Sequence, residues 1–273
     1  VGVFKAAKDA GVEKIYGMRN GIEGFLNKKV VDMSEYVKNE LDIELLKRTP
    51  SSFLGTCRFK LPSVEESEAT YKLLFSIMEE LDIKYFFYIG GNDSMDTIKK
   101  LSNYAEEIGS DIRFMGVPKT IDNDLAVTDH TPGYGSAAKY IASALKEIIR
   151  DVNTYPTESV TVVEIMGRNA GWLTAAAALS RAEDCPGPDL IYLPEVTFDY
   201  DRFLEQVKAV KKKKTSVVIA VSEGIKLANG EYVCEDNKQA TFEDSFGHKS
   251  LGGTALYLAD FIGANLGVKS RGI

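Results

Sequence analysis

The distribution of apolar residues along the chain predicts short strands that alternate with helices. The strand candidates are Lys84–Ile89, Ile112–Val117, Val160–Ile165, Leu190–Leu193 and Ser216–Val221. Several of these runs are apolar at consecutive positions, as a strand inside a parallel sheet must be when helices cover both of its faces. The pattern therefore favours an α/β fold with mostly parallel sheets.

Helices are predicted where apolar residues recur at three-to-four spacing. The stripes are Val3–Ala10; Ile98, Leu101, Ala105 and Ile108; Tyr140, Ile141, Ala144, Leu145 and Ile148; and Phe203, Val207 and Val210. We expect Ser136 to be the N-cap of a helix over Ala137–Ile149. We interpret Lys211–Lys214 as the solvated C-terminus of a helix in preference to an anion site.

Composition places the chain among ordinary globular proteins. It has 273 residues, enough for two domains, with 44% hydrophobic and 27% charged residues. The net charge of −7 argues against an extended surface for nucleic acid or an anionic membrane. The three cysteines are scattered, with neither zinc-site spacing nor a disulfide framework, which favours a reducing, cytoplasmic environment. No apolar run is long enough to span a bilayer.

Two further features concern the organisation of the chain. The stretch Asp151–Ser159 has loop composition and is expected to link two lobes. The sequence begins inside a predicted helix and stops at "KSRGI" without a predicted terminal element. We therefore expect a longer protein from which both ends are missing here.

Polar and charged residues concentrate directly after the predicted strands. These segments are Gly90–Ser94, Pro118–Asp124, Met166–Gly171 and Ser222–Gly224. In doubly wound sheets, ligands bind beyond the carboxyl ends of the strands. Carboxylates, a lysine, an arginine and glycines at one sheet edge indicate a phosphorylated ligand, a metal ion and a general base.

Each of these segments also has a structural interpretation. The alternatives are a tight turn for Gly90-Gly91, Asx turns for Asp122 and Asp124, a surface cation for Arg168, and a plain turn for Glu223 before Gly224. Both interpretations stay open for each segment alone. The functional one gains weight because all four segments are expected to follow successive strands of one sheet.

Four motifs in this order, "IGGNDS", "PKTIDND", "EIMGRNAGW" and "SEG", resemble the phosphofructokinases. The segment "FLGTCRF" resembles the arginine-bearing loop of that family. The match covers almost the whole chain. It implies two Rossmann-like three-layer lobes with mostly parallel sheets, residues 1–133 binding the phosphoryl donor and residues 134–273 binding fructose 6-phosphate. The implied activity is phosphoryl transfer to the sugar 1-hydroxyl in glycolysis.

Two positions bear on the donor. ATP-using phosphofructokinases resemble "GGDGS" and "PGTIDND", whereas this chain has Asp93 and Lys119 where those motifs have a glycine. This double change resembles the pyrophosphate-dependent subfamily, whose reaction is close to reversible. The Asp93 carboxylate would occupy the volume and charge of the ATP α-phosphate and repel it. Lys119 would place a cation where charge develops during transfer.

The resemblance also implies roles at the sugar site. Asp122 is the implied base that takes the proton of the sugar hydroxyl, assisted by Lys119 and Arg168. Thr120 and Ile121 flank the base. The residues implied to bind the sugar phosphate are Thr120, Ile121, Asp122, Met166, Gly167, Arg168 and Glu223.

At the donor site, Arg58 is implied to touch the transferring group, and Gly90 and Gly91 to let the backbone approach the phosphates. The implied cofactor is Mg²⁺, with Asn92, Asp93 and Asp124 as candidate ligands. Asn92 stands where ATP users carry a magnesium-associated aspartate, and an amide oxygen is a weaker ligand.

The chain departs from the family in other ways. The family's opening strand and first glycine loop are missing, as is its later basic motif. Ser159 stands where bacterial ATP-using relatives carry an arginine that reaches a neighbouring subunit's substrate, and Arg271 is a candidate for a second such arginine. Because related enzymes are dimers or tetramers, we expect a homo-oligomer.

Three alternatives compete with pyrophosphate-dependent transfer. An ATP-dependent kinase of the same fold is the nearest. A non-catalytic regulatory subunit would suit Asn92 and the missing ends, but the retention of Lys119, Asp122 and Arg168 together argues against it. A dehydrogenase is disfavoured because no GxGxxG motif opens a βαβ unit.

Overall fold

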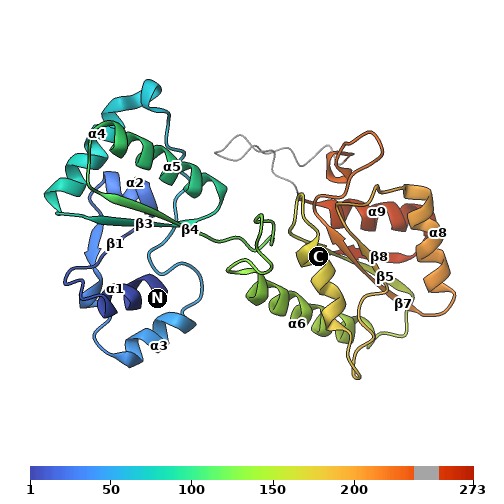
Figure 1. Cartoon of the computed structure of the whole chain (residues 1–273). Coiled ribbons are helices and arrows are strands. Elements are labelled where there is room, and N and C mark those ends of the chain that lie inside the picture. Colours follow the sequence, from blue (N-terminus) through green and yellow to red (C-terminus); the bar gives the residue numbers. More distant parts are fainter. Residues whose placement is uncertain (237–251) are drawn as a thin grey trace. The chain divides into compact units, whose positions relative to one another are not determined.

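The computed structural model describes residues 1–236 and 252–273, which form two compact units, Val1–Pro118 and Lys119–Ile273 (Figure 1). The sequence placed the boundary after residue 133. It also made Asp151–Ser159 the link between lobes, and this was wrong, because that segment lies inside the second unit. The assignment of one ligand to each lobe stays a prediction.

The first unit is built on a parallel pair of strands, β3 (Tyr85–Gly90) and β4 (Arg113–Pro118). Helix α5 (Asn92–Glu107) connects them, as a parallel pair requires. Helices α5 and α4 (Val64–Glu80) bury one face of the pair in an aromatic-rich core. Both strands were predicted to within one residue at each end.

The other face of this pair is apolar but exposed. Tyr85, Phe87 and Ile89 of β3 and Met115 of β4 are between 43% and 64% exposed. They alternate along β3 with Phe86, which is buried. Apolar residues on both faces of β3 were predicted correctly, but only one face is covered by the described residues.

Small elements make up the rest of the first unit. They are α1 (Gly2–Asp9), β1 (Tyr16–Met18), α2 (Gly21–Leu26), β2 (Val30–Asp32), a 3₁₀ turn (Met33–Glu35) and α3 (Glu40–Arg48). β1 and β2 pair antiparallel, and a small core of Phe4, Met33, Val37 and Ile43 joins α1 to α3. Of these elements only α1 was predicted; β1 and β2 have three residues each and α2 has six, which is too short for a clear periodic pattern, and α3 was missed as well.

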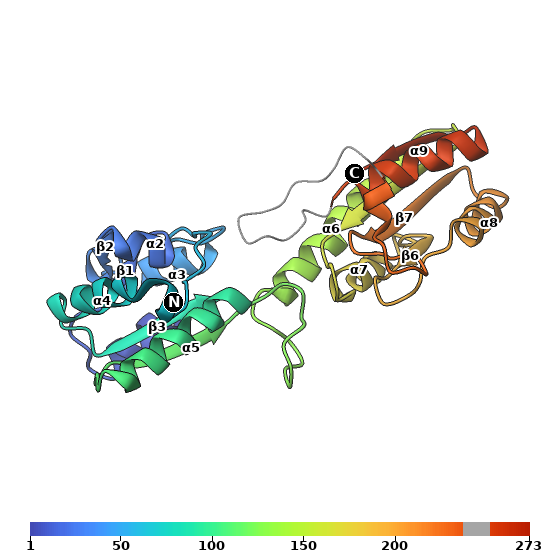
Figure 2. The ribbon, with the colours of Figure 1, turned by 90° about the horizontal axis from the view of Figure 1, so that it is seen from above.

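The second unit has a four-stranded, fully parallel sheet in the order β6-β7-β5-β8. Its strands are β5 (Ser159–Ile165), β6 (Leu190–Tyr192), β7 (Ser216–Ser222) and β8 (Lys269–Gly272). One face packs against α6 (Tyr134–Val152), α7 (Trp172–Ala175) and the 3₁₀ turn Ala176–Ser180. The other packs against α8 (Tyr200–Lys211) and α9 (Thr254–Leu266), and a 3₁₀ turn (Val233–Asp236) adjoins it. Figure 2 shows strands of this sheet between α9 and α7.

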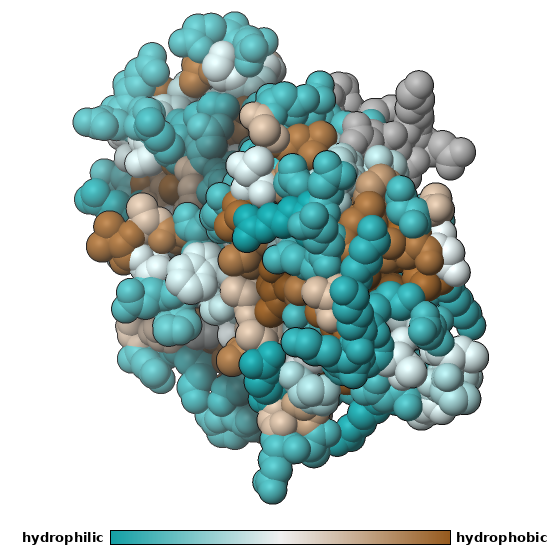
Figure 3. Space-filling model, turned by 90° about the vertical axis from the view of Figure 1, so that its right-hand side faces the viewer, coloured by the Kyte–Doolittle hydropathy of each residue, from teal (hydrophilic) through white to brown (hydrophobic). Residues whose placement is uncertain are grey.

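Hydrophilic residues dominate the face shown in Figure 3, with hydrophobic residues in patches between them. The predicted solvated lysine run at the end of α8 is confirmed only in part, because Lys212 and Lys213 are exposed whereas Lys211 and Lys214 are partly buried in ion pairs. Lys211 pairs with Glu158 at 2.7 Å and Lys214 with Asp189 at 2.6 Å.

No described helix has both the length and the apolar run that a bilayer crossing needs.

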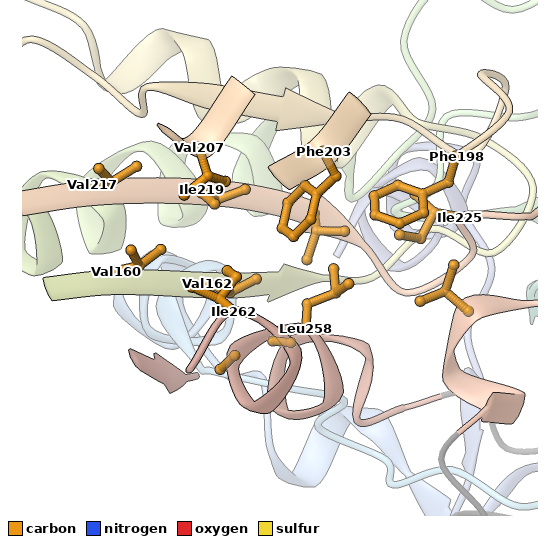
Figure 4. Packing of buried hydrophobic residues seen from close by; sticks show 14 residues of the cluster. Val160, Val162, Phe198, Phe203, Val207, Val217, Ile219, Ile225, Leu258 and Ile262 are labelled. Atoms are coloured by element: carbon orange, nitrogen blue, oxygen red, sulfur yellow. The ribbon is translucent and has the colours of Figure 1, made fainter. Parts of the chain in front are cut away.

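The core of the second unit follows from strict alternation along its central strands. Val160 and Val162 of β5 face α8 and α9, whereas Val163 and Ile165 face α6 and α7. Figure 4 shows the first pair beside Ile219 of β7. Full burial of one such side chain stabilises the fold by roughly 1.5–3 kcal/mol.

Two further predictions about this unit, and one about the sheets of both units, were wrong. "KSRGI" was given no element, yet β8 pairs with β5 there. Ser136 lies inside α6, whose N-cap is Gly133 with φ of 110°. The polar segments do not share one sheet edge, because β3 and β4 belong to a different sheet from β5 and β7.

Candidate active site

The loop after β4 carries the predicted base. The Asp122 amide donates a hydrogen bond to Thr120 Oγ1 at 3.1 Å. Thr120 also forms an isolated parallel bridge with Gly133, at the other end of the loop. The backbone on both sides of Asp122 is therefore fixed by local bonds. The hydrogen bond that makes the turn is accepted by the Thr120 side chain and does not belong to an Asx turn of Asp122, the structural alternative for this residue.

Burial and the negative charge of Asp124 raise the pKa of the half-buried Asp122 carboxyl. The hydrogen bond from Thr120 and the positive charges of Lys119 and Arg168 act in the opposite direction. Lys119 and Arg168, the other two predicted catalytic residues of the second unit, therefore both lie within electrostatic reach of Asp122. A carboxylate with a raised pKa is a better proton acceptor near neutral pH.

The turns after β5 and β7 interlock. Ser222 Oγ donates to the Gly167 carbonyl at 2.6 Å, and the Gly167 amide donates to Glu223 Oε1 at 3.2 Å. The Gly224 amide donates back to Ser222 Oγ at 3.0 Å. Because β5 and β7 are neighbours in the sheet, the predicted sugar-phosphate residues of both turns form one surface.

Glycine is required at two positions of these turns. Gly167 has φ of 137°, and a Cβ there would lie 2.5 Å from the Ala170 carbonyl oxygen. A Cβ on Gly224 would lie 2.0 Å from the carbonyl oxygen of Arg168. The two turns can pack this closely only because neither glycine has a side chain.

Glu223 occupies a half-buried position beside this surface. Burial and the charges of Glu164 and Asp122 raise its pKa, while the Gly167 amide and Arg168 lower it.

A pocket of about 490 Å³ adjoins the ends of β5, β7 and β8; its lining is Glu164, Met166, Glu223, Gly253, Ala255, Leu256, Gly272 and Ile273. Glu164, which no sequence argument identified, accepts the Ala255 amide at 2.9 Å at the start of α9.

In the first unit, the "GGNDS" segment is a tight strand-to-helix turn. β3 ends at Gly90, Gly91 is the N-cap of α5, and Asp93 lies in the first helical turn. A Cβ on Gly90 would lie 2.0 Å from Ser94 Oγ. A helix N-terminus with glycines before it favours anions, and its dipole also favours the Asp93 carboxylate.

The loop that carries Arg58 lies against this turn. Burial, with the neighbouring Cys57 thiol, raises the pKa of Tyr88 to about 12, and the Tyr88 hydroxyl also interacts with Ser94. Asn20 Nδ2 donates to the Thr56 carbonyl at 3.1 Å and holds the loop from the other side. The first unit thus brings the Arg58 loop and Gly90–Ser94 together, and Tyr88 is a contact that the sequence did not suggest.

The remaining predicted residues are placed as follows. Thr120 and Ile121 precede Asp122 in the loop after β4, Met166 is exposed at the end of β5, and Asp124 is exposed. Within the described part of the chain, no three His, Cys, Asp or Glu side chains form a group that could hold a metal. Arg271 of β8 bonds Asp151 at 3.1 Å and Thr161 Oγ1 at 3.3 Å.

Comparison with known proteins identifies the fold. The phosphofructokinase family model matches residues 1–272. A pyrophosphate–fructose 6-phosphate 1-phosphotransferase of Xanthomonas campestris is 43% identical over 258 residues, which cover 94% of this chain and 60% of that protein. The enzyme of that name from Halomonas elongata is 39% identical over 98% of this chain and 64% of that protein.

The solved structure of pyrophosphate-dependent phosphofructokinase from Nitrosospira multiformis superposes with a TM-score of 0.82 at 35% identity, covering 100% of this chain and 63% of that one. A sulfofructose kinase of Alkalicoccus urumqiensis is 32% identical over 95% of this chain and 64% of that protein. The chain thus spans about 60% of the length of the curated relatives it matches. It belongs to the phosphofructokinase family.

Proposed function

We propose that the protein transfers a phosphoryl group reversibly from pyrophosphate to the 1-hydroxyl of fructose 6-phosphate, giving fructose 1,6-bisphosphate and phosphate. The observation that carries this proposal is the half-buried Asp122 carboxyl, whose pKa is raised by burial while Lys119 and Arg168 act on it. A base beside two cations suits the transfer of an anionic group to an alcohol.

In the proposed mechanism, Asp122 accepts the proton of the sugar 1-hydroxyl as that oxygen bonds to phosphorus. The bridging P–O bond of pyrophosphate breaks, and phosphate leaves with the bonding pair. Lys119 and Arg168 neutralise charge on the transferring group, and Arg58 contributes from the donor side. Met166, Gly167 and Arg168 hold the sugar phosphate, while Glu223 accepts hydrogen bonds from ring hydroxyls.

The donor assignment rests on Asp93 and Lys119. Asp93 projects from the first turn of α5, directly after the glycines that would approach the donor phosphates. Repulsion by this carboxylate disfavours an α-phosphate, which pyrophosphate lacks. The names of the relatives from Xanthomonas campestris and Halomonas elongata support the same donor.

Mg²⁺ fits the residues present. The charge of Asp124 raises the pKa of Asp122, so two carboxyl groups lie near enough to repel each other, and Asp124 is exposed. Mg²⁺ is commonly held by one or two carboxylates together with substrate phosphates. Asp124 is the proposed ligand in the second unit, with Asn92 and Asp93 as candidates in the first; the bound ion would neutralise phosphate charge. A homo-oligomer in the cytoplasm remains part of the proposal.

The test is a donor and acceptor assay of the purified full-length protein. We expect turnover of fructose 6-phosphate with pyrophosphate and at most slight turnover with ATP. Equal rates with both donors would contradict the proposal, and no rate with either would favour a non-catalytic subunit. Faster turnover of sulfofructose than of fructose 6-phosphate would reassign the acceptor.

A further inference from the structure

Asn123 is the buried centre of the loop that carries Asp122. The residue is only 6% exposed, and its backbone is left-handed, with φ of 58°. Asn123 Oδ1 accepts the Thr131 amide at 2.8 Å, and Nδ2 donates to the Asp129 carbonyl at 3.1 Å. Both ends of the side-chain amide therefore hold the returning half of the same loop.

Thr131 continues this network to the other side of Asp122. The residue is 3% exposed, and its hydroxyl donates to the Thr120 carbonyl at 2.6 Å. The Thr120 side chain in turn accepts the Asp122 amide. Asp122 thus lies between Thr120 and Asn123, whose positions are set by one connected set of buried and part-buried hydrogen bonds.

We propose that Asn123 and Thr131 form a clamp that positions Asp122 for proton abstraction. This inference rests on the proposed function of Asp122 as base. Neither clamp residue acts on substrate; each acts through the backbone that carries Asp122. Because a displacement of about 1 Å in a reacting group can lower a rate by about 10²-fold, loss of the clamp is expected to lower kcat more than it changes KM.

The residue types fit this role. Among non-glycine residues, asparagine is several-fold enriched in the left-handed conformation, and its amide both donates and accepts. An aspartate at 123 would still accept the Thr131 amide but would no longer donate to the Asp129 carbonyl. Valine at 131 would keep the shape of threonine but lose the hydroxyl that bonds Thr120.

The experiment compares four proteins: wild type, Thr131→Val, Thr131→Ser and Asn123→Gly. Glycine keeps the left-handed backbone without strain and removes only the side-chain bonds. Steady-state assays with pyrophosphate and fructose 6-phosphate should give kcat about 10- to 100-fold lower for Thr131→Val and Asn123→Gly, with both KM values changed much less. Thr131→Ser, which retains the hydroxyl, should stay near the wild-type kcat.

Hydrogen exchange measured by mass spectrometry provides a readout that does not depend on activity. Amides of 120–133 should exchange faster in Thr131→Val and Asn123→Gly, but not in Thr131→Ser. Faster exchange with an unchanged kcat would overturn the positioning role, and unchanged exchange would overturn the clamp. If wild type were inactive, the proposed function would fail while the exchange comparison would still decide whether the clamp exists.

Discussion

Glu223 carries a stability cost that follows from its surroundings. It is half-buried, and the charges of Glu164 and Asp122 raise its pKa in the same direction as burial does. The charged form of Glu223 is therefore less stable in the folded protein than in water. The hydrogen bond from the Gly167 amide needs only an oxygen acceptor, so the negative charge of Glu223 is expected to serve a ligand.

The change Glu223→Gln should therefore raise thermal stability at neutral pH. Below the ordinary glutamate pKa of 4.5 the wild-type carboxyl is protonated in both the folded and the unfolded state, and its neutral form is fully tolerated. As pH rises from 4.5 through the raised folded pKa, ionisation of Glu223 favours the unfolded state, so the free energy of unfolding of wild type falls. The variant has no ionisable group at this position and does not lose stability in this way. The difference in Tm should be small in acid and favour the variant near neutrality. A Tm difference that shrinks as pH rises would contradict this.

Asp122→Asn tests the proposed base. The amide keeps the volume of the side chain but cannot accept the hydroxyl proton, so kcat should fall by about 10²- to 10⁴-fold. KM for fructose 6-phosphate should change little, because the loss concerns the transition state. The matched control is Asp129→Asn in the same loop, an exposed residue whose clamp contact is made by its backbone carbonyl. Equal effects of the two changes would remove the assignment.

Asp93→Gly tests the donor selector. Removing the carboxylate should give measurable ATP binding and turnover and should alter pyrophosphate kinetics. Asp93→Asn separates charge from volume, since it removes only the charge. If ATP binding stayed unmeasurable in Asp93→Gly while pyrophosphate kinetics stayed unchanged, the account of donor choice would be wrong.

The sequence allows residues with distinctive chemistry to be proposed for the site, but it does not point to the residues that only hold them. Asp93 and Lys119 stand out because each replaces a glycine of a family motif. Asn123 lies in the same motif as Asp122, yet nothing in the sequence indicates that its φ is positive or that Thr131 is its partner. Glu164 was hidden because a single acidic residue inside an apolar strand does not reveal the helix N-terminus that it meets.

At the scale of elements, two serines illustrate the difference between a real and an apparent helix start. Ser63 is the N-cap of α4 in a complete capping box with Glu66. Ser136 follows two nearby glycines, which made it look like a cap, but α6 already begins at Tyr134. The cap of α6 is Gly133, whose positive φ the sequence does not reveal.

Ser63→Ala should lower the free energy of unfolding by about 1 kcal/mol, because the orphan amide of the first turn loses its acceptor. Ser136→Ala should be neutral or slightly stabilising, since alanine is the better helix former within a helix. Chemical denaturation followed by circular dichroism measures both. A larger loss for Ser136→Ala than for Ser63→Ala would contradict the assigned helix start.

Four of the five predicted strands share two properties; the fifth, β6, has only three residues and was predicted from its apolar run alone. β3, β4, β5 and β7 are runs of six or seven residues, and each is followed by a polar turn. β1, β2 and β8 have three or four residues, and β8 is a polar segment, Lys-Ser-Arg-Gly. Its strand conformation comes from pairing with β5, which is tertiary context that local pattern cannot supply.

At the scale of the whole molecule, each compact unit has hydrophobic cores of its own. Leu74 lies in the core of the first unit and Ile219 in that of the second, and both are fully buried. Either change to alanine should cost about 2–5 kcal/mol. Hydrogen exchange should rise mainly in the unit that carries the change. An equal rise throughout both units would show that they unfold as one.

The pairing of β8 with β5 also determines when the sheet of the second unit can be completed during synthesis. β8 pairs with β5 across a large sequence separation, 110 residues between Thr161 and Arg271. During synthesis, β5 therefore leaves the ribosome long before β8 exists, and its other neighbour among the described strands, β7, also follows it in the sequence. Parallel pairing of such distant segments is slow. The β8 edge of β5 lacks its native partner until residue 272 emerges, and an unpaired strand edge in an incomplete chain is a surface that chaperones protect.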